Sequence, residues 1–170
     1  MFLDIHELER DRIALDQSFL PGRIDFGEDV WEVEALDVRG WAELIAGEIR
    51  LRGDFRTVME VPCARCLERT RRAVAMDFDL FYRPVQTIAR EEEVEIKGDD
   101  LDIGFFQGDG LLLEDALREQ ILLALPMKSI CKPDCQGLCP QCGRNRNLGP
   151  CGCAPATPDA RWTPLAGFKP

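Results

Sequence analysis

The chain has 170 residues, of which 45% are hydrophobic and 31% are charged, and its formal net charge is −10. These values are typical of one soluble globular domain with, at most, a small appendage. They exclude a helical membrane protein, because no apolar run approaches the roughly 18 residues that a span needs. They also argue against a simple electrostatic RNA binder, which would be basic.

The charge is distributed unevenly along the chain. Residues 128–170 carry a net charge of +4, whereas residues 1–127 carry −14. Because a zinc ion held by four thiolates carries about −2, metal binding near the C-terminus would offset much of the positive excess. The N-terminal sequence is acidic where a signal peptide would be basic and then apolar, so we expect a cytoplasmic protein.

The first elements are only partly visible in the pattern. Leu3, Ile5 and Leu8 fall on one side of a short turn or helix, and residues 12–19 read as a strand. Residues 30–44 alternate between apolar and polar side chains, but the apolar positions change parity near Leu36. A one-residue phase shift of this kind predicts a β-bulge.

The clearest element covers residues 49–61, where apolar side chains fall on one parity and charged side chains on the other. Residues 74–82 alternate in the same way. Pro62 ends the first segment, and the motif Cys63-Ala-Arg-Cys66 follows it. We predict a long antiparallel hairpin with one dry face, one wet face and the two cysteines at its tip.

An acidic run follows at residues 90–102 and is typical of a solvated loop or an edge strand. Residues 111–125 then carry an apolar stripe at helical spacing, with Asp109 as the expected N-cap and Pro126 as the end. We expect this helix to pack on the dry face of the sheet. The predicted class is α+β: an antiparallel sheet with a long CxxC-tipped hairpin, one main buried helix and a zinc-stabilised C-terminal segment.

The chain has eight cysteines, and six of them lie between residues 131 and 153. Clustered cysteines in a cytoplasmic protein are more often metal ligands than disulfides. The motif Cys139-Pro-Gln-Cys142-Gly is typical of a zinc knuckle, whose glycine lets the backbone turn around the metal. Cys151 and Cys153 follow closely enough to complete a set of four thiolates, which is what a structural zinc ion requires.

The remaining four cysteines form two pairs, each of which needs a partner pair. Cys63 and Cys66 lack a glycine after the second cysteine, so that motif is weaker, and Cys131 and Cys135 also have a chelating spacing. We favour a second four-thiolate site formed by these residues, which gives two zinc ions. The alternative adds Cys131 or Cys135 to the knuckle and leaves one zinc ion.

Catalytic patterns are weak throughout the sequence. A thioredoxin-like CxxC lies at the start of a helix, whereas both flanks of Cys63 and Cys66 read as strands, so a thiol redox protein is the less favoured alternative. The single histidine, His6, lies in an acidic amphipathic stretch and reads as a surface or packing residue. No nucleophile elbow, phosphate loop or HExxH motif occurs. We expect neither an enzyme nor a small-molecule substrate.

Arginines near the C-terminus are the candidates for contact with RNA or a protein partner. Arg144 and Arg146 lie between the two halves of the knuckle, and Arg161 follows it. A tight zinc loop could present such residues to phosphates or splayed bases. A solvated polar loop is the simpler interpretation of the same residues.

Taken together, these motifs resemble the YceD family of large ribosomal RNA subunit accumulation proteins. The resemblance rests on Val61-Pro-Cys-Ala-Arg-Cys-Leu-Glu, on the helix ending Leu123-Ala-Leu-Pro-Met-Lys, on the run from Cys131 to Gly143, and on Cys151-Gly-Cys. It covers most of the chain and implies a role in 23S rRNA accumulation, not an enzymatic one. The sequence departs from the family's pattern at Arg146, where a leucine is more usual.

The expected organisation is a sheet-and-helix core at residues 1–127 and a cysteine-rich zinc-binding segment at residues 128–170 that packs on it. The resemblance implies a non-enzymatic factor in large ribosomal subunit biogenesis. Its partners would be a pre-ribosomal large subunit, rRNA or a basic ribosomal protein, and an acidic body suits a basic protein better than naked RNA. The alternative is a general zinc-dependent interaction module unrelated to ribosomes.

Overall fold

The computed structural model describes residues 1–85, 103–154 and 161. The expectation for the acidic run at residues 90–102 lies outside these residues, as do Trp162, Leu165 and Phe168, the apolar side chains that the sequence offers as anchors for the end of the chain. Within the described part of the chain, no helix is long and apolar enough to cross a membrane.

Most of the described chain is β-structure. In chain order the elements are β1 (Phe2–Asp4), α1 (Ile5–Leu8), β2 (Ile13–Phe19), β3 (Trp31–Glu32), β4 (Leu36–Ile45), β5 (Glu48–Pro62), β6 (Arg69–Pro84), β7 (Ile103–Phe106), β8 (Gly110–Leu112), α2 (Leu113–Ala124) and the 3₁₀ helix η3 (Arg146–Leu148). The main sheet has the order β2-β4-β5-β6-β7, with β3 also paired to β5, and β1 pairs with β8. All pairs are antiparallel except β6 with β7. This is an α+β architecture, as the sequence predicted.

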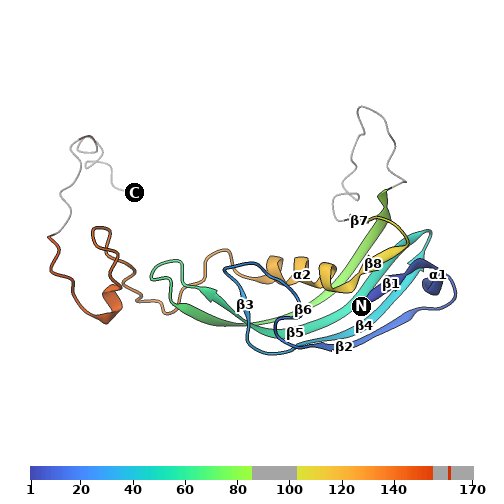
Figure 1. Cartoon of the computed structure of the whole chain (residues 1–170), viewed down its shortest axis with the longest axis horizontal. Coiled ribbons are helices and arrows are strands. Elements are labelled where there is room, and N and C mark those ends of the chain that lie inside the picture. The colour runs from blue at the N-terminus through green and yellow to red at the C-terminus, as the bar shows by residue number, and fades with distance from the viewer. Residues whose placement is uncertain (86–102, 155–160, 162–170) are drawn as a thin grey trace.

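The pair β5 and β6 is the longest feature of the sheet. Its register runs from Ile49 opposite Tyr82 to Pro62 opposite Arg69. The alternation that marks β5 in the sequence buries Leu51, Phe55 and Met59 on one face, because successive side chains of a strand point to opposite faces. The far end of this pair extends beyond the helix, toward the cysteine-rich segment (Figure 1).

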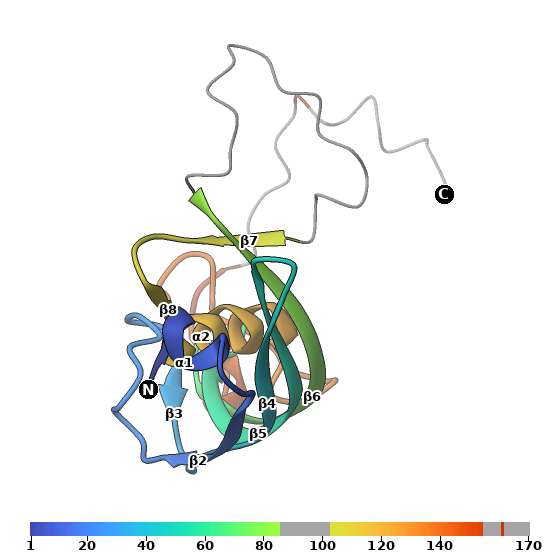
Figure 2. The same cartoon turned by 90° about the vertical axis from the view of Figure 1, so that its right-hand side faces the viewer.

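Helix α2 lies along the concave face of the sheet, and β2, β4, β5 and β6 curve around it (Figure 2). The side chains of Leu113, Ala116, Leu117 and Ile121 are buried in the same core as those of β5. Each fully buried leucine or isoleucine contributes about 1.5–3 kcal/mol relative to an exposed one. The helix therefore closes the core from one side, as its apolar stripe predicted.

The start of α2 differs from the prediction, and the assignment of Asp109 as the N-cap is wrong. The helix begins at Leu113, and no side chain caps it. Residues 110–112 are extended because they pair with β1 as β8. The residue before β1 supplies a backbone acceptor at the start of the helix, since the N–H of Leu113 donates to the carbonyl of Met1 at 3.0 Å.

The parity change near Leu36 corresponds to an interruption between two strands. β3 and β4 both pair with β5, and residues 33–35 separate them. The N–H groups of Val33 and Glu34 both donate to the carbonyl oxygen of Val58, at 2.9 and 3.4 Å. Two residues thus face one, which is the pairing of a β-bulge.

Two glycines allow β4 and β5 to approach closely at the bend of the sheet. Gly40 lies opposite Gly53 in the register. A Cβ atom built on Gly53 would lie 2.1 Å from the carbonyl oxygen of Arg39, and one built on Gly40 would lie 2.2 Å from that of Arg52. Neither position accepts a side chain without movement of the opposite strand.

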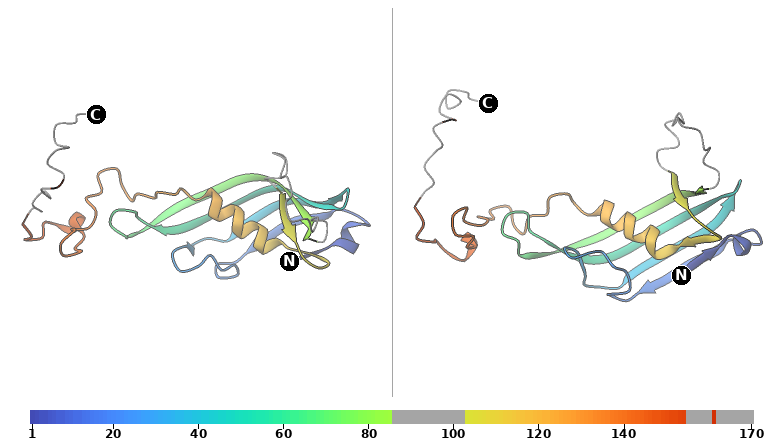
Figure 3. Two further views of the ribbon diagram at one scale, coloured as in Figure 1. Left: turned by 90° about the horizontal axis from the view of Figure 1, so that it is seen from above. Right: turned by 45° about the horizontal axis from the view of Figure 1, so that its top comes forward.

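After α2 the chain returns to the tip of the β5–β6 pair, where the cysteine-rich segment lies (Figure 3). The N–H of Ala64 donates to the carbonyl of Ser129 at 2.7 Å. The Arg72 guanidinium donates to the Ser129 hydroxyl at 2.9 Å and to the Ile130 carbonyl at 2.7 Å. These bonds fix the segment that carries Cys131 against the strand that follows Cys66.

Candidate metal centres

The loop between β5 and β6 forms a tight turn around Cys63. The N–H of Leu67 donates to the Cys63 carbonyl at 2.9 Å, and the N–H of Cys63 donates to the Glu68 carbonyl at 2.9 Å. Leu67 adopts a left-handed backbone conformation with φ of 64°. This turn places the side chains of Cys63 and Cys66 on the same side of the loop.

The segment around Cys139 repeats the same turn. The N–H of Gly143 donates to the Cys139 carbonyl at 2.8 Å, and Gly143 has φ of 70°. Leu67 therefore occupies the position of the knuckle glycine. The absence of glycine after Cys66 made that motif weak in the sequence, but the turn forms nevertheless, at a cost of about 1–2 kcal/mol for a left-handed leucine.

This strain predicts that Leu67→Gly raises stability. Leu67 is 64% exposed, so the substitution removes little packing, and relief of the left-handed strain should raise the free energy of unfolding by up to about 1 kcal/mol. Chemical denaturation of the metal-loaded protein measures this. The matched control is Leu148→Gly, because Leu148 is 73% exposed but lies in η3; it should be neutral or destabilising. Equal midpoints for the two variants would contradict the argument.

Four sulfur atoms converge where the tip meets the segment after α2. They belong to Cys63, Cys66, Cys131 and Cys135, and all lie within 4.8 Å of one another. The Sγ atoms of Cys63 and Cys135 are 3.9 Å apart, and those of Cys66 and Cys131 are 3.6 Å apart. These distances are too long for a disulfide. They match the roughly 3.8 Å edge of a tetrahedron with zinc–sulfur distances of about 2.3 Å.

Backbone donors stabilise negative charge at one of these sulfurs. Burial by itself raises the pKa of the Cys63 thiol, but three backbone N–H groups donate to its sulfur and lower the pKa to about 6; they belong to Cys131, Arg65 and Cys66. The N–H of Glu68 acts in the same direction on Cys66, yet burial and the neighbouring sulfurs raise the pKa of Cys66 to about 12. Four thiolates this close together require a cation.

Polar side chains around this group hold its ligands in place. Arg65 donates to the Cys135 carbonyl at 3.0 Å. The Asn147 amide donates to the Cys135 sulfur at 3.4 Å, and this bond is the main reason that the pKa of Cys135 is lowered. The Asn145 amide donates to the Glu68 carboxylate at 2.9 Å. Such outer contacts orient metal ligands and tune their basicity.

The second group of four sulfurs belongs to Cys139, Cys142, Cys151 and Cys153, again within 4.8 Å of one another. Cys139 is buried, whereas Cys142 is exposed. The N–H groups of Cys142 and Gln141 lower the pKa of Cys139 to about 6. The two groups divide the eight cysteines in the way that the spacing favoured, and both have the donor set of a structural zinc site.

The loop between Cys142 and Cys151 has two distinct sides. The side chains of Asn145 and Asn147 turn inward to the first group of sulfurs, as described above. Arg144 and Arg146 are exposed, and no ion pair involves either side chain in the described part of the chain. Arg161 is also exposed. The arginines are therefore accessible, whereas the two asparagines have a structural task that the sequence did not reveal.

The arrangement favours a structural role for a bound ion. Each group offers four protein ligands, which fills a tetrahedral shell and leaves no position for a substrate. Cys63 lies in a turn between two strands, so no helix dipole activates it as in thioredoxin-like proteins. His6 is exposed and is hydrogen bonded to Asp4 at 3.1 Å. Arg65 and Arg72 were missed as positioning residues, because no sequence pattern marks their partners, which are backbone carbonyls and, for Arg72, also the Ser129 hydroxyl.

Comparison with known proteins places these features in a family context. The family model described as "Large ribosomal RNA subunit accumulation protein YceD" matches residues 51–169, which include all eight cysteines. An uncharacterized protein of Mycobacterium tuberculosis is 32% identical over 109 residues, or 64% of this chain and 49% of the relative. No solved structure matches the chain.

Two plant relatives carry a functional name. The chloroplastic large ribosomal RNA subunit accumulation protein YCED homolog 1 of Zea mays is 31% identical over 147 residues, or 72% of this chain and 50% of the relative. Its counterpart in Arabidopsis thaliana is 27% identical over 151 residues, or 72% of this chain and 44% of the relative. The chain thus spans about half the length of the curated relatives that it matches.

Proposed function

Because the chain belongs to the YceD family of large ribosomal RNA subunit accumulation proteins, we propose that it is a non-enzymatic factor in large ribosomal subunit biogenesis that supports 23S rRNA accumulation. The observation that carries the proposal is the family match over residues 51–169, supported by the names of the two plant relatives. We place its action in the cytoplasm, as its sequence predicts.

The same proposal assigns two structural zinc ions to the protein. One is held by Cys63, Cys66, Cys131 and Cys135, and the other by Cys139, Cys142, Cys151 and Cys153. The sulfur–sulfur distances of 3.6 and 3.9 Å support the first site, and the repeated knuckle turn supports both. When bound, zinc crosslinks segments that are distant in sequence and takes no part in a reaction. The ion at the first site ties the segment after α2 to the hairpin tip.

This crosslink gives the proposed division of the chain a physical basis. We propose residues 1–127 as the core and residues 128–170 as a zinc-held segment, which takes Cys63 and Cys66 of its first ligand set from the core. The segment presents the exposed side chains of Arg144 and Arg146. We propose these two residues and Arg161 as the contacts to a pre-ribosomal large subunit, either to rRNA or to a ribosomal protein.

Sedimentation of ribosomes tests the proposal. Cells depleted of the protein should have a lower ratio of 50S to 30S subunits than undepleted cells. Re-expression of the chain should restore this ratio. A variant with Arg144→Ala and Arg146→Ala should keep its metal but restore the ratio only in part, because it loses phosphate or partner contacts. An unchanged 50S to 30S ratio after depletion would refute the proposal and favour an interaction module unrelated to ribosomes.

A further inference from the structure

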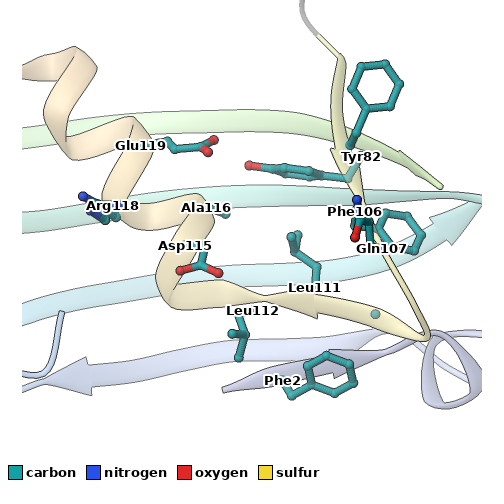
Figure 4. A pocket seen from close by; sticks show the side chains of 12 residues that line it. Phe2, Tyr82, Phe106, Gln107, Leu111, Leu112, Asp115, Ala116, Arg118 and Glu119 are labelled. Atoms are coloured by element: carbon teal, nitrogen blue, oxygen red, sulfur yellow. The ribbon is translucent and has the colours of Figure 1, made fainter. Parts of the chain in front are cut away.

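A pocket of about 540 Å³ lies where α2, β6, β7 and β8 meet (Figure 4). It is at the opposite end of the molecule from the cysteine groups (Figure 1). Its walls combine aromatic and aliphatic side chains with three charged groups on α2, which are Asp115, Arg118 and Glu119. The proposed role of the zinc sites does not involve this pocket.

Tyr82 provides an unusual polar group inside the pocket. Its side chain is only 6% exposed, and its hydroxyl makes no hydrogen bond to any residue that the structure describes. Figure 4 shows the hydroxyl directed toward Glu119 on α2. Burial raises the pKa of Tyr82, and the nearby carboxylates of Glu119 and Asp115 raise it further. Because Tyr82 lines the pocket, its hydroxyl is available to form a hydrogen bond with an occupant.

The position of Tyr82 depends on a glycine in the neighbouring strand. Tyr82 lies opposite Gly104 in the register of β6 and β7. A Cβ atom at Gly104 would lie 2.5 Å from the tyrosine ring. The ring can therefore lie flat over β7 only because residue 104 has no side chain.

The charge of the pocket favours a cationic occupant. Asp115 and Glu119 are exposed at its rim, and neither forms an ion pair within residues 1–85, 103–154 and 161. Arg118 is the single basic side chain in the lining, which leaves an excess of negative charge. The chain as a whole carries −10, and a field of this sign steers basic partners toward it.

Apolar surface around the pocket indicates that the occupant is not a small cation alone. Phe2, Phe105 and Leu112 line the pocket and are 52%, 50% and 46% exposed. Leu123, which is 76% exposed, lines an adjoining pocket on the other side of Glu119 and Tyr82. Exposed apolar residues gathered around a polar centre are typical of a protein-interaction site.

We propose that this pocket binds an arginine or lysine side chain presented by a basic segment of a partner protein. The methylene stem packs against the aromatic walls, as long basic side chains do on apolar surfaces. The charged head meets the carboxylates of Asp115 and Glu119 and donates to the Tyr82 hydroxyl. Apolar side chains that flank the basic residue in the partner cover Phe2, Phe105 and Leu112.

The single tyrosine of the chain makes the site observable. Protein labelled with 3-fluorotyrosine carries one fluorine resonance, which reports on this pocket alone. The probe is a short capped peptide in which arginine and leucine alternate, and the comparison peptide alternates glutamate and leucine. We expect a saturable shift with the arginine peptide and none with the glutamate peptide. No shift with either peptide, or an equal shift with a single-stranded RNA oligonucleotide, would overturn the proposal.

A charge-matched pair of variants separates the pocket from the overall charge of the chain. Asp115→Asn with Glu119→Gln should weaken binding of the fluorescently labelled arginine peptide about tenfold, equivalent to about 1.4 kcal/mol. Asp16→Asn with Glu28→Gln makes the same change in net charge at exposed positions elsewhere and should leave the affinity unchanged. Equal losses in both variants would mean non-specific attraction and would also overturn the proposal.

Discussion

Cys135→Ser should release one of two zinc ions and detach the C-terminal segment from the hairpin. The substitution removes one of four ligands, and a structural zinc site with three thiolates binds far more weakly. The zinc content measured by elemental analysis should fall from about two ions to about one per chain. The bonds from Ala64 to Ser129 and from Leu138 to Arg65 join the two segments, so hydrogen exchange at the amides of Ala64 and Leu138 should accelerate about 100-fold.

Cys142→Ser is the matched control, because it removes one ligand from the other site. Its zinc content should also fall to about one ion, but Ala64 should stay protected. The two sites are not independent, however, since Asn147 lies in the loop that the second site closes and donates to the Cys135 sulfur. Zinc affinity at the first site should therefore fall about tenfold. Equal exchange rates at Ala64 in the two variants, or one ion in the unmodified protein, would contradict this assignment.

The elements with the strongest periodicity could be predicted from the sequence. The alternation in residues 49–61 predicted a strand with one buried and one exposed face. The structure shows this strand as β5, and α2 covers its buried face. The pairing of the cysteines also followed from spacing, because a chelating pair at a hairpin tip needs a second pair brought to it by the chain. The strand pattern had one favourable solution, whereas the spacing of the cysteines favoured two groups of four but left a single-zinc arrangement open.

Long-range backbone contacts account for most of what the sequence did not reveal. Residues 110–112 carry leucines that suit a helix, yet they are extended because β1 pairs with them. The Cys63–Cys66 motif looked weak because no glycine follows Cys66. Sequence alone cannot show that surrounding hydrogen bonds hold Leu67 in a left-handed conformation. No sequence pattern marks Asn145 and Asn147, and only their partners, Glu68 and Cys135, identify them as structural.

Gly53→Ala should destabilise the core by about 3 kcal/mol or more, although it adds only a methyl group. The new Cβ would lie 2.1 Å from the Arg39 carbonyl oxygen, which belongs to backbone and cannot rotate away. β4 and β5 must separate locally, which weakens ladder hydrogen bonds at the centre of the sheet. Urea denaturation measures the loss. Gly152→Ala is the control, since a Cβ there meets no atom within 4 Å; its unfolding midpoint should not change.

A double-mutant cycle with Gly40→Ala distinguishes strand separation from strain confined to one residue. Gly40 and Gly53 lie opposite each other, and a Cβ on either meets the backbone of the other's strand. If the cost is the separation of β4 from β5, the first substitution makes room for the second. The double variant should then lose at least about 1 kcal/mol less than the sum of the single losses. Additive losses would show that each strand deforms alone and would disprove close packing of the two backbones as the cause.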